Sequence, residues 1–162
     1  TTSVGGLPHS ISLLTKLVRM ANYKVKYALR NRLARSLQAE IQKQGLIDYG
    51  TLYDSIRISA VKSDRLNELS ITINAMYYYL FLDAGTERGI EPHFITQYWL
   101  DRPDTRAVLN EIIADFIQWQ IKEYPLLDVA KILSNPKVTI DFNWIEDPYA
   151  GLPTSPTYNL TI

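Results

Sequence analysis

Residues 51–94, TLYDSIRISAVKSDRLNELSITINAMYYYLFLDAGTERGIEPHF, carry the pattern that decides the fold. Every second residue from Ile56 to Ala60 is apolar, and the same period returns from Leu69 to Ala75. A period of two is typical of strands with one buried face. Because the intervening residues 62–68 are polar and turn-like, the two strands should pair as an antiparallel hairpin. The apolar, aromatic run 76–84 then predicts a short helix ended by Gly85 and followed by a loop over 86–94.

Upstream of this stretch, apolar residues recur at steps of three and four from Ile11 to Ile41. This spacing predicts an amphipathic helix that ends near Gly45, a residue type favoured at helix C-termini. At about 30 residues, such a helix is much longer than the average in globular proteins. Residues 1–10 contain Gly5, Gly6 and Pro8, and we expect a flexible lead-in there.

Downstream of the loop over 86–94, we expect residues 95–100 to have an extended backbone. Pro103 and Asp104 then mark the start of a second helix, because proline tolerates the first helical turn and an acid there suits the helix dipole. A broad apolar stripe between Val108 and Trp119 should pack this helix on the sheet, and the helix should stop before Pro125.

The remaining chain contains one clear strand. Val138, Ile140, Phe142 and Trp144 alternate with polar residues, which predicts a strand that joins the sheet of the hairpin. Before it, residues 126–133 predict one or two helical turns. Residues 146–162 contain three of the eight prolines and no clear periodicity, so they read as an extended C-terminal arm.

These elements predict an α+β fold. It consists of a long N-terminal helix, a small antiparallel sheet of about three or four strands, a second helix packed on the sheet, and an extended C-terminal arm. With 162 residues, 46% of them hydrophobic, the chain suits one compact domain, which we place at residues 11–145.

The composition argues against several classes of chemistry. There is no cysteine, which excludes disulfides, thiolate metal sites and a cysteine nucleophile. No apolar run approaches the roughly 20 residues of a membrane helix. The two histidines, His9 and His93, have no second ligand at metal spacing, and no phosphate-binding glycine motif or GxSxG is present. We therefore expect a non-enzymatic protein without a cofactor or metal and without membrane contact.

The neutral net charge conceals two oppositely charged parts. Residues 1–44 contain eight Lys or Arg and a single acid, a net charge of +7, which leaves −7 for the rest of the chain. The candidate basic face of the first helix consists of Lys24, Lys26, Arg30, Arg32 and Arg35. Two functions fit this asymmetry: non-specific contact with the phosphates of double-stranded DNA, or complementary surfaces that attract neighbouring copies of the protein.

The aromatic run supplies a second candidate surface. Tyrosine and tryptophan are favoured at interfaces because they bury a large area and keep a polar tip. We expect part of this run in the core and at least one tyrosine between subunits. The candidate interface residues are Tyr77, Tyr78, Tyr79, Phe81, Asp83 and Thr86. The acids Asp83, Glu87 and Glu91 also lie close together in sequence, as in a metal-dependent nuclease, but solvated loop acids explain them more simply.

The order of elements resembles the neck proteins of tailed bacteriophages, the family of head-to-tail connector, tail-completion and minor tail proteins. Leu52, Ser55 and Ile56 match the Leu-x-x-Ser-Ile signature of that family. Phe81, Gly85 and Thr86 are similar to its Phe-x-x-Gly-Thr turn with one residue more, and Asp83 is near the usual acidic position. Pro92 and Phe94 are similar to its Pro-Phe step, with His93 inserted.

The resemblance covers residues 11–124 and implies a structural role. It implies a cyclic homo-oligomer in the neck or upper tail of the virion, assembled in the host cytoplasm, with DNA passing through the lumen. Its partners would be copies of itself and neighbouring portal, connector or tail proteins. The alternative from the residues alone is a sequence-independent DNA-binding protein that uses the basic first helix.

Overall fold

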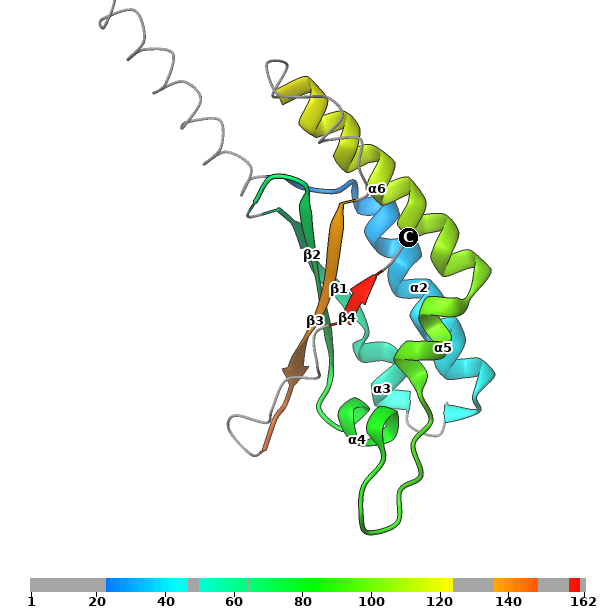
Figure 1. The fold of residues 1–162 in the computed structure, drawn as a ribbon. Helices are drawn as coiled ribbons and strands as arrows, with labels where there is room; N and C mark the ends of the chain where they lie inside the picture. Colours follow the sequence, from blue (N-terminus) through cyan, green and yellow to red (C-terminus); the bar gives the residue numbers. More distant parts are fainter. Residues whose placement is uncertain (1–22, 47–49, 64, 124–135, 149–157, 161–162) are drawn as a thin grey trace, which may run out of the picture.

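The structure, a computed structural model, describes residues 23–46, 50–63, 65–123, 136–148 and 158–160. Its elements in chain order are α2 Tyr27–Lys43, α3 Gly50–Ser55, β1 Arg57–Lys62, β2 Glu68–Met76, α4 Tyr79–Ala84, α5 Ile95–Asp101, α6 Pro103–Glu123, β3 Lys137–Ile145 and β4 Tyr158–Leu160. The strands form one sheet, and α2, α5 and α6 lie together on one side of it (Figure 1). The α+β fold predicted from the sequence is therefore confirmed.

Some predicted segments lie outside the described residues. These are the lead-in at 1–10, the first part of the N-terminal helix at 11–22, and the helical turns at 126–133. None of the helices in the described ranges combines the length and the apolarity needed to cross a lipid bilayer.

The sheet has the strand order β1-β2-β3-β4 and mixes two kinds of pairing. β1 and β2 form the predicted antiparallel hairpin, and β3 joins the sheet as predicted, where it lies beside β2. However, β3 runs parallel to β2, so the expectation of a purely antiparallel sheet is wrong for this pair. The cause is α6, which spans about 30 Å at 1.5 Å per residue and so matches the length of β2. It returns the chain to the end of the sheet where β2 begins (Figure 1).

A β-bulge in β1 changes which residues face the core. The register with β2 shifts between Ile58 and Ala60, so Ser59 is the extra residue. Val61 is consequently buried, whereas Ala60, which simple alternation places in the core, is half-buried. In β2 the predicted alternation holds without interruption from Leu69 to Ala75.

The helix predicted for residues 11–45 is not continuous in its described part. Residues 23–26 are not helical, and the backbone of Lys26 is extended, with φ −60° and ψ 140°. Tyr23 and Val25 are buried while Lys24 and Lys26 are exposed, which is the period of an extended segment. The prediction of one continuous helix is therefore wrong over these four residues.

A pocket on α6 holds this extended segment in place. The ring of Tyr23 lies 5.0 Å from that of Phe116 and 5.1 Å from that of Trp119, measured between centroids. Its hydroxyl donates a hydrogen bond to Asp115 Oδ2 at 2.7 Å. Burial, together with the neighbouring carboxylate, raises the pKa of Tyr23 well above its ordinary value. The aromatic contacts outweigh the local helical preference of the segment.

The segment after the hairpin contains two short helices. α4 ends at Gly85 as predicted, and Gly85 has the positive φ of +76° that favours glycine. Residues 95–100 were expected to be extended, but they form α5, so that prediction is wrong. The residue before α5, Phe94, is left-handed and offers no side-chain cap, so a local start signal is missing.

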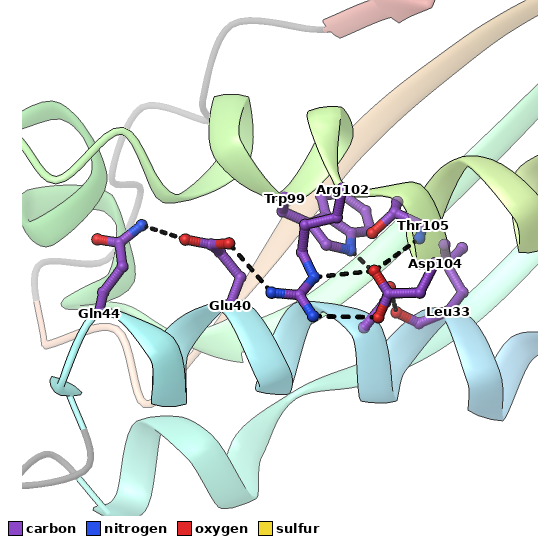
Figure 2. A network of polar contacts seen from close by, with 8 residues as sticks. Leu33, Glu40, Gln44, Trp99, Arg102, Asp104 and Thr105 are labelled. Atoms are coloured by element: carbon purple, nitrogen blue, oxygen red, sulfur yellow. Dashed lines mark hydrogen bonds and ion pairs between the residues drawn. The ribbon is translucent and has the colours of Figure 1, made fainter.

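A polar network joins α2 to the corner between α5 and α6 (Figure 2). Arg102 donates to the buried carboxylate of Glu40 at 3.3 Å and to both carboxylate oxygens of Asp104, at 2.9 and 3.2 Å. Gln44 donates to the other oxygen of Glu40 at 2.7 Å. Nearby, the indole of Trp99 donates to the hydroxyl of Ser36 at 2.8 Å. These bonds fix the position of α2 against the helical corner.

Part of the C-terminal arm belongs to the sheet. β4 pairs antiparallel with β3, with Val138 opposite Leu160 and Ile140 opposite Tyr158. The arm was predicted to be extended and to lack an element of its own. It is extended at 158–160, but there it forms the edge strand of this chain's own sheet (Figure 1).

Candidate functional site

The five candidate basic residues do not form one continuous face. Lys24 and Lys26 lie in the extended segment before α2, and the other three lie on α2. On a helix with 3.6 residues per turn, Arg32 and Arg35 point to one side and Arg30 points roughly to the opposite side. The positive charge is therefore divided between two surfaces.

One of these surfaces faces α6 and is partly neutralised. Arg32 forms an ion pair with Glu111 of α6, and Lys26 Nζ lies 4.0 Å from Asp115 Oδ1. Because both pairs are largely exposed, each contributes about 0–1 kcal/mol to stability. Their main effect is to reduce the positive charge that α2 offers to a partner on this side.

The other surface is a hollow between α2 and β1. Two adjoining cavities of about 410 and 540 Å³ share Arg30 and Ser59 in their linings. We call this surface the basic groove; its charged lining residues are Lys24, Arg30, Arg57 and Lys62. Tyr23, Val25 and Val61 supply apolar walls, and Tyr27 lies at the rim with Arg30 5.6 Å from its ring centroid. Among the residues that the structure describes, no acidic side chain lines either cavity.

Two polar atoms in the lining of the groove have no hydrogen-bond partner among the described residues. Arg30 Nε is a donor and Asn74 Oδ1 is an acceptor, and both atoms are buried. Both residues line the larger cavity. Buried polar atoms are normally satisfied, so a buried donor and acceptor in one hollow suit a ligand with both functions.

The aromatic run divides between core and surface. Tyr79 is fully buried, and its ring lies 5.0 Å from that of Phe142 and 6.0 Å from that of Trp144. Tyr77, Tyr78 and Phe81 are half-buried and meet edge to face, with Tyr77 5.5 Å from Tyr78 and 6.4 Å from Phe81. Burial raises the pKa of Tyr78. Of the four aromatic residues in this run, only Tyr77, Tyr78 and Phe81 have exposed surface that a partner could contact.

Asp83 is also buried, and it caps the N-terminus of α5 although it is distant from α5 in the sequence. Its Oδ1 accepts the backbone N–H of Thr96 at 2.9 Å, and its Oδ2 accepts the hydroxyl of Thr96 at 2.9 Å. The Thr96 hydroxyl lies 2.7 Å from the hydroxyl of Tyr79. Since Thr96 gives its only hydroxyl proton to Asp83, Tyr79 donates to Thr96. Tyr79 and Asp83 therefore hold α4 against α5.

Residues 85–94 form a loop that projects from the end of the molecule below α4 in Figure 1, and we call it the exposed loop. A side chain at Gly85 would place its Cβ 2.9 Å from Ile90 O and from Pro92 Cδ. Only glycine therefore lets the start of the loop approach residues 90–92 this closely. Thr86 donates its N–H to Ile90 O at 2.9 Å, and its hydroxyl accepts the Ile90 N–H at 3.2 Å. These bonds give the loop a defined shape.

The large hydrophobic side chains that are exposed lie in two places. Among the described residues they are Tyr27, at 72% exposed, and Ile90, Phe94 and Tyr98, at 41, 48 and 53%. The last three belong to the exposed loop and the start of α5, whereas Tyr27 begins α2. These two places are at opposite ends of the molecule in Figure 1.

The three acids considered as a nuclease site do not converge. Asp83 is buried against Thr96, whereas Glu87 and Glu91 are exposed in the loop. Within the described ranges, no three histidine, aspartate or glutamate side chains are grouped closely enough to hold a metal ion. His93 is half-buried, and its backbone N–H donates to Leu82 O at 2.9 Å.

The basic groove and the exposed apolar side chains of the loop were not predicted from the sequence. The groove depends on Arg57 and Lys62 of β1 lying beside α2, which is a tertiary contact. The alternation of apolar and charged residues from Tyr23 to Lys26 is the local signal that could have indicated an extended segment there.

Comparisons with protein-family models, with curated proteins and with solved structures found no match for this chain.

Proposed function

We propose that this chain is a structural subunit of an oligomeric ring in the neck or upper tail of a tailed bacteriophage, where it joins head to tail or completes the tail around the DNA channel. The observation that carries the proposal is the group of exposed hydrophobic side chains on the exposed loop and the adjoining α5, namely Ile90, Phe94 and Tyr98. Several exposed apolar side chains in one part of a surface mark a protein contact. When such a surface meets a different surface of the next copy, the copies are arranged head to tail.

The residues behind the family resemblance support the proposal because they act together. Ser55 donates its hydroxyl to Leu52 O at 2.7 Å and accepts the Met76 N–H at 3.0 Å, which ties α3 to the end of β2. Gly85 shapes the exposed loop directly after the aromatic run. The signatures thus build one end of the molecule, from the end of β2 to the exposed loop.

The DNA-binding alternative places one basic face on the first helix, and the structure divides that face. Lys26 and Arg32 face acids of α6, whereas Lys24 and Arg30 line the basic groove together with Arg57 and Lys62. A phosphate-binding face needs several cations on one accessible surface, so the groove is the surface that would contact DNA. We assign non-specific DNA contact a secondary role in the assembled ring, where many copies would surround the passing duplex.

The genes that flank the coding sequence provide the first test. Adjacent portal, capsid and tail genes would support the proposal, and a neighbourhood of metabolic or regulatory genes would contradict it. In a virus that carries the gene, a stop codon at Tyr27 should yield DNA-filled heads and separate tails, and a plasmid copy should restore joined particles. Normal particles without this protein would overturn the proposal.

A further inference from the structure

We propose that the basic groove of one copy receives the exposed loop of the next copy, so that successive subunits contact each other head to tail. This inference rests on the proposed assembly function and names the two surfaces that carry it. The groove lies between α2 and β1, whereas the loop projects beyond α4, so the two are separate surfaces of the same molecule (Figure 1). A contact between two different surfaces leaves one groove and one loop free on every pair, so it continues into a closed ring or an open chain.

The charges of the two surfaces are complementary. In the described ranges, the charged residues that line the groove are all cations: Lys24, Arg30, Arg57 and Lys62. The loop presents the exposed carboxylates of Glu87 and Glu91, with Arg88 as its only exposed cation. Opposite charges at an interface accelerate encounter and exclude wrong orientations, including groove against groove.

The apolar parts also correspond. Ile90 is 41% exposed and lies between the two acids of the loop in the sequence. The groove has apolar walls at Val25 and Val61 between its cations. A buried aliphatic side chain surrounded by charge pairs is the usual arrangement of an interface core and rim.

The unpartnered atoms of the groove indicate which part of the loop is bound. A peptide unit has a carbonyl oxygen, which Arg30 Nε requires, and an N–H, which Asn74 Oδ1 requires. In the described part of the chain, β1 pairs only with β2, so its outer edge is also available to an extended backbone. Residues 90–94 of the loop have a non-helical backbone, and the N–H groups of Ile90, His93 and Phe94 are bonded within their own copy. Pro92 has no N–H, so Glu91 is the residue of this segment that supplies an N–H to the groove.

A covalent trap can test this contact directly. One loop in a groove buries less than the roughly 1,200–2,000 Å² of stable interfaces, so the free protein should associate weakly. The full chain contains no cysteine, which gives a clean background. We would introduce Ser59→Cys in the groove and Ile90→Cys in the loop, oxidise the concentrated double variant, and separate the products on a non-reducing gel.

The double variant should form a ladder of linked copies. A mixture of the two single variants should give the mixed dimer and no longer product, because each copy then carries one reactive end. Arg30→Glu in the double variant should reduce the linked fraction about tenfold, whereas Arg35→Glu, the same charge change on an exposed part of α2, should reduce it less than about twofold. A second double variant, Ala114→Cys with Ile90→Cys, is the position control, because Ala114 lies on the exposed side of α6 and outside the groove.

Each outcome separates this inference from the proposed function. No ladder from the double variant, or an equal ladder from the Ala114 control, overturns the loop-in-groove contact. If the natural protein still forms rings or joins heads to tails, the proposed function survives that result. If the ladder is specific but the flanking genes are not viral, the loop-in-groove contact is supported and the proposed function in a phage neck is contradicted.

Discussion

Arg102 places its guanidinium 3.3 Å from the carboxylate of Glu40, a side chain of α2 that is only 3% exposed (Figure 2). A buried carboxylate is costly unless it is paired and hydrogen-bonded. Arg102 leads from α5 into α6, so this ion pair connects α2 with the corner between these two helices. The same guanidinium is oriented by Asp104 at 2.9 Å.

Replacing Arg102 with Met should destabilise the fold by about 2–3 kcal/mol, because Glu40 loses its cation. The value is below that of a fully buried pair since the Arg102 side chain is 21% exposed and Gln44 still donates to Glu40. Urea unfolding measures the change. The double variant Arg102→Met with Glu40→Gln should recover at least half of the loss, and a purely additive double variant would contradict the pairing.

The pH dependence of stability should include a contribution from Asp104. The hydrogen bonds from Arg102 lower the pKa of Asp104 in the folded protein. A lowered pKa stabilises the fold above the unfolded value, about 3.9, and this contribution is lost as the pH falls through the folded value. Because the side chain is 51% exposed, the effect should be less than about 1 kcal/mol.

Asp104→Asn should therefore lower stability at pH 7, and this loss should shrink as the pH falls below about 3.9 and through the lowered folded value, because the natural carboxyl then becomes protonated too. Asp101→Asn is the matched control, because that side chain is more exposed, at 67%, and lies 4.0 Å from its partner Arg106. Equal losses for the two variants at pH 7 would show that the Arg102 bonds contribute nothing.

Much of the fold could be predicted because burial imposes a local period. β2 and β3 follow it with few exceptions, and the proline and acid at the start of α6 mark that helix correctly. The failures occur where a distant residue decides the local structure. α5 is capped by Asp83, thirteen positions earlier, and residues 23–26 are extended because α6 accepts the ring of Tyr23.

The candidate site was harder to predict than the fold. Sequence distinguishes charged from apolar residues, but it does not show which cations meet acids of another helix. Arg32 and Arg30 look alike in sequence, yet one faces Glu111 and the other lines the basic groove. Likewise, three consecutive tyrosines gave no sign that only Tyr79 is fully buried, because a short turn places them on different sides.

Thr96 joins Asp83 and Tyr79, so its hydroxyl should matter more than that of Tyr79. Thr96→Val removes a donor from Asp83 and an acceptor from Tyr79 with little change of shape, and should cost about 2–3 kcal/mol. Tyr79→Phe removes only one donor and should cost about 1 kcal/mol. Chemical denaturation of both variants gives the comparison, and a larger loss for Tyr79→Phe would contradict the assigned direction of the bonds.

Gly85→Ala should distort the exposed loop. The substitution combines a positive φ with contacts at 2.9 Å to Ile90 O and Pro92, and we expect a loss of at least about 2 kcal/mol. Gly89→Ala is the control, since that residue also has a positive φ but nothing lies within 4 Å of its added Cβ. Thermal unfolding and limited proteolysis of the loop should show the larger change for Gly85, and equal effects would mean that the close approach is unimportant.

The aromatic run offers a last test of which residues can reach a partner. Tyr79→Asp places a carboxylate in the core and removes the ring packed on Phe142, so it should cost at least about 4 kcal/mol and unfold a large fraction of the free protein. Tyr78 is half-buried and directly precedes α4, where a negative charge suits the helix dipole. Tyr78→Asp should therefore cost no more than about 1–2 kcal/mol.

Circular dichroism during urea unfolding separates these two variants before any assembly assay is made. A folded Tyr78→Asp protein that fails to enter particles would identify Tyr78 as a contact residue, because the subunit itself is intact. A folded Tyr79→Asp protein would contradict the buried position of that ring. Failure of assembly with Tyr79→Asp carries no information about an interface, since the lost core contact already explains it.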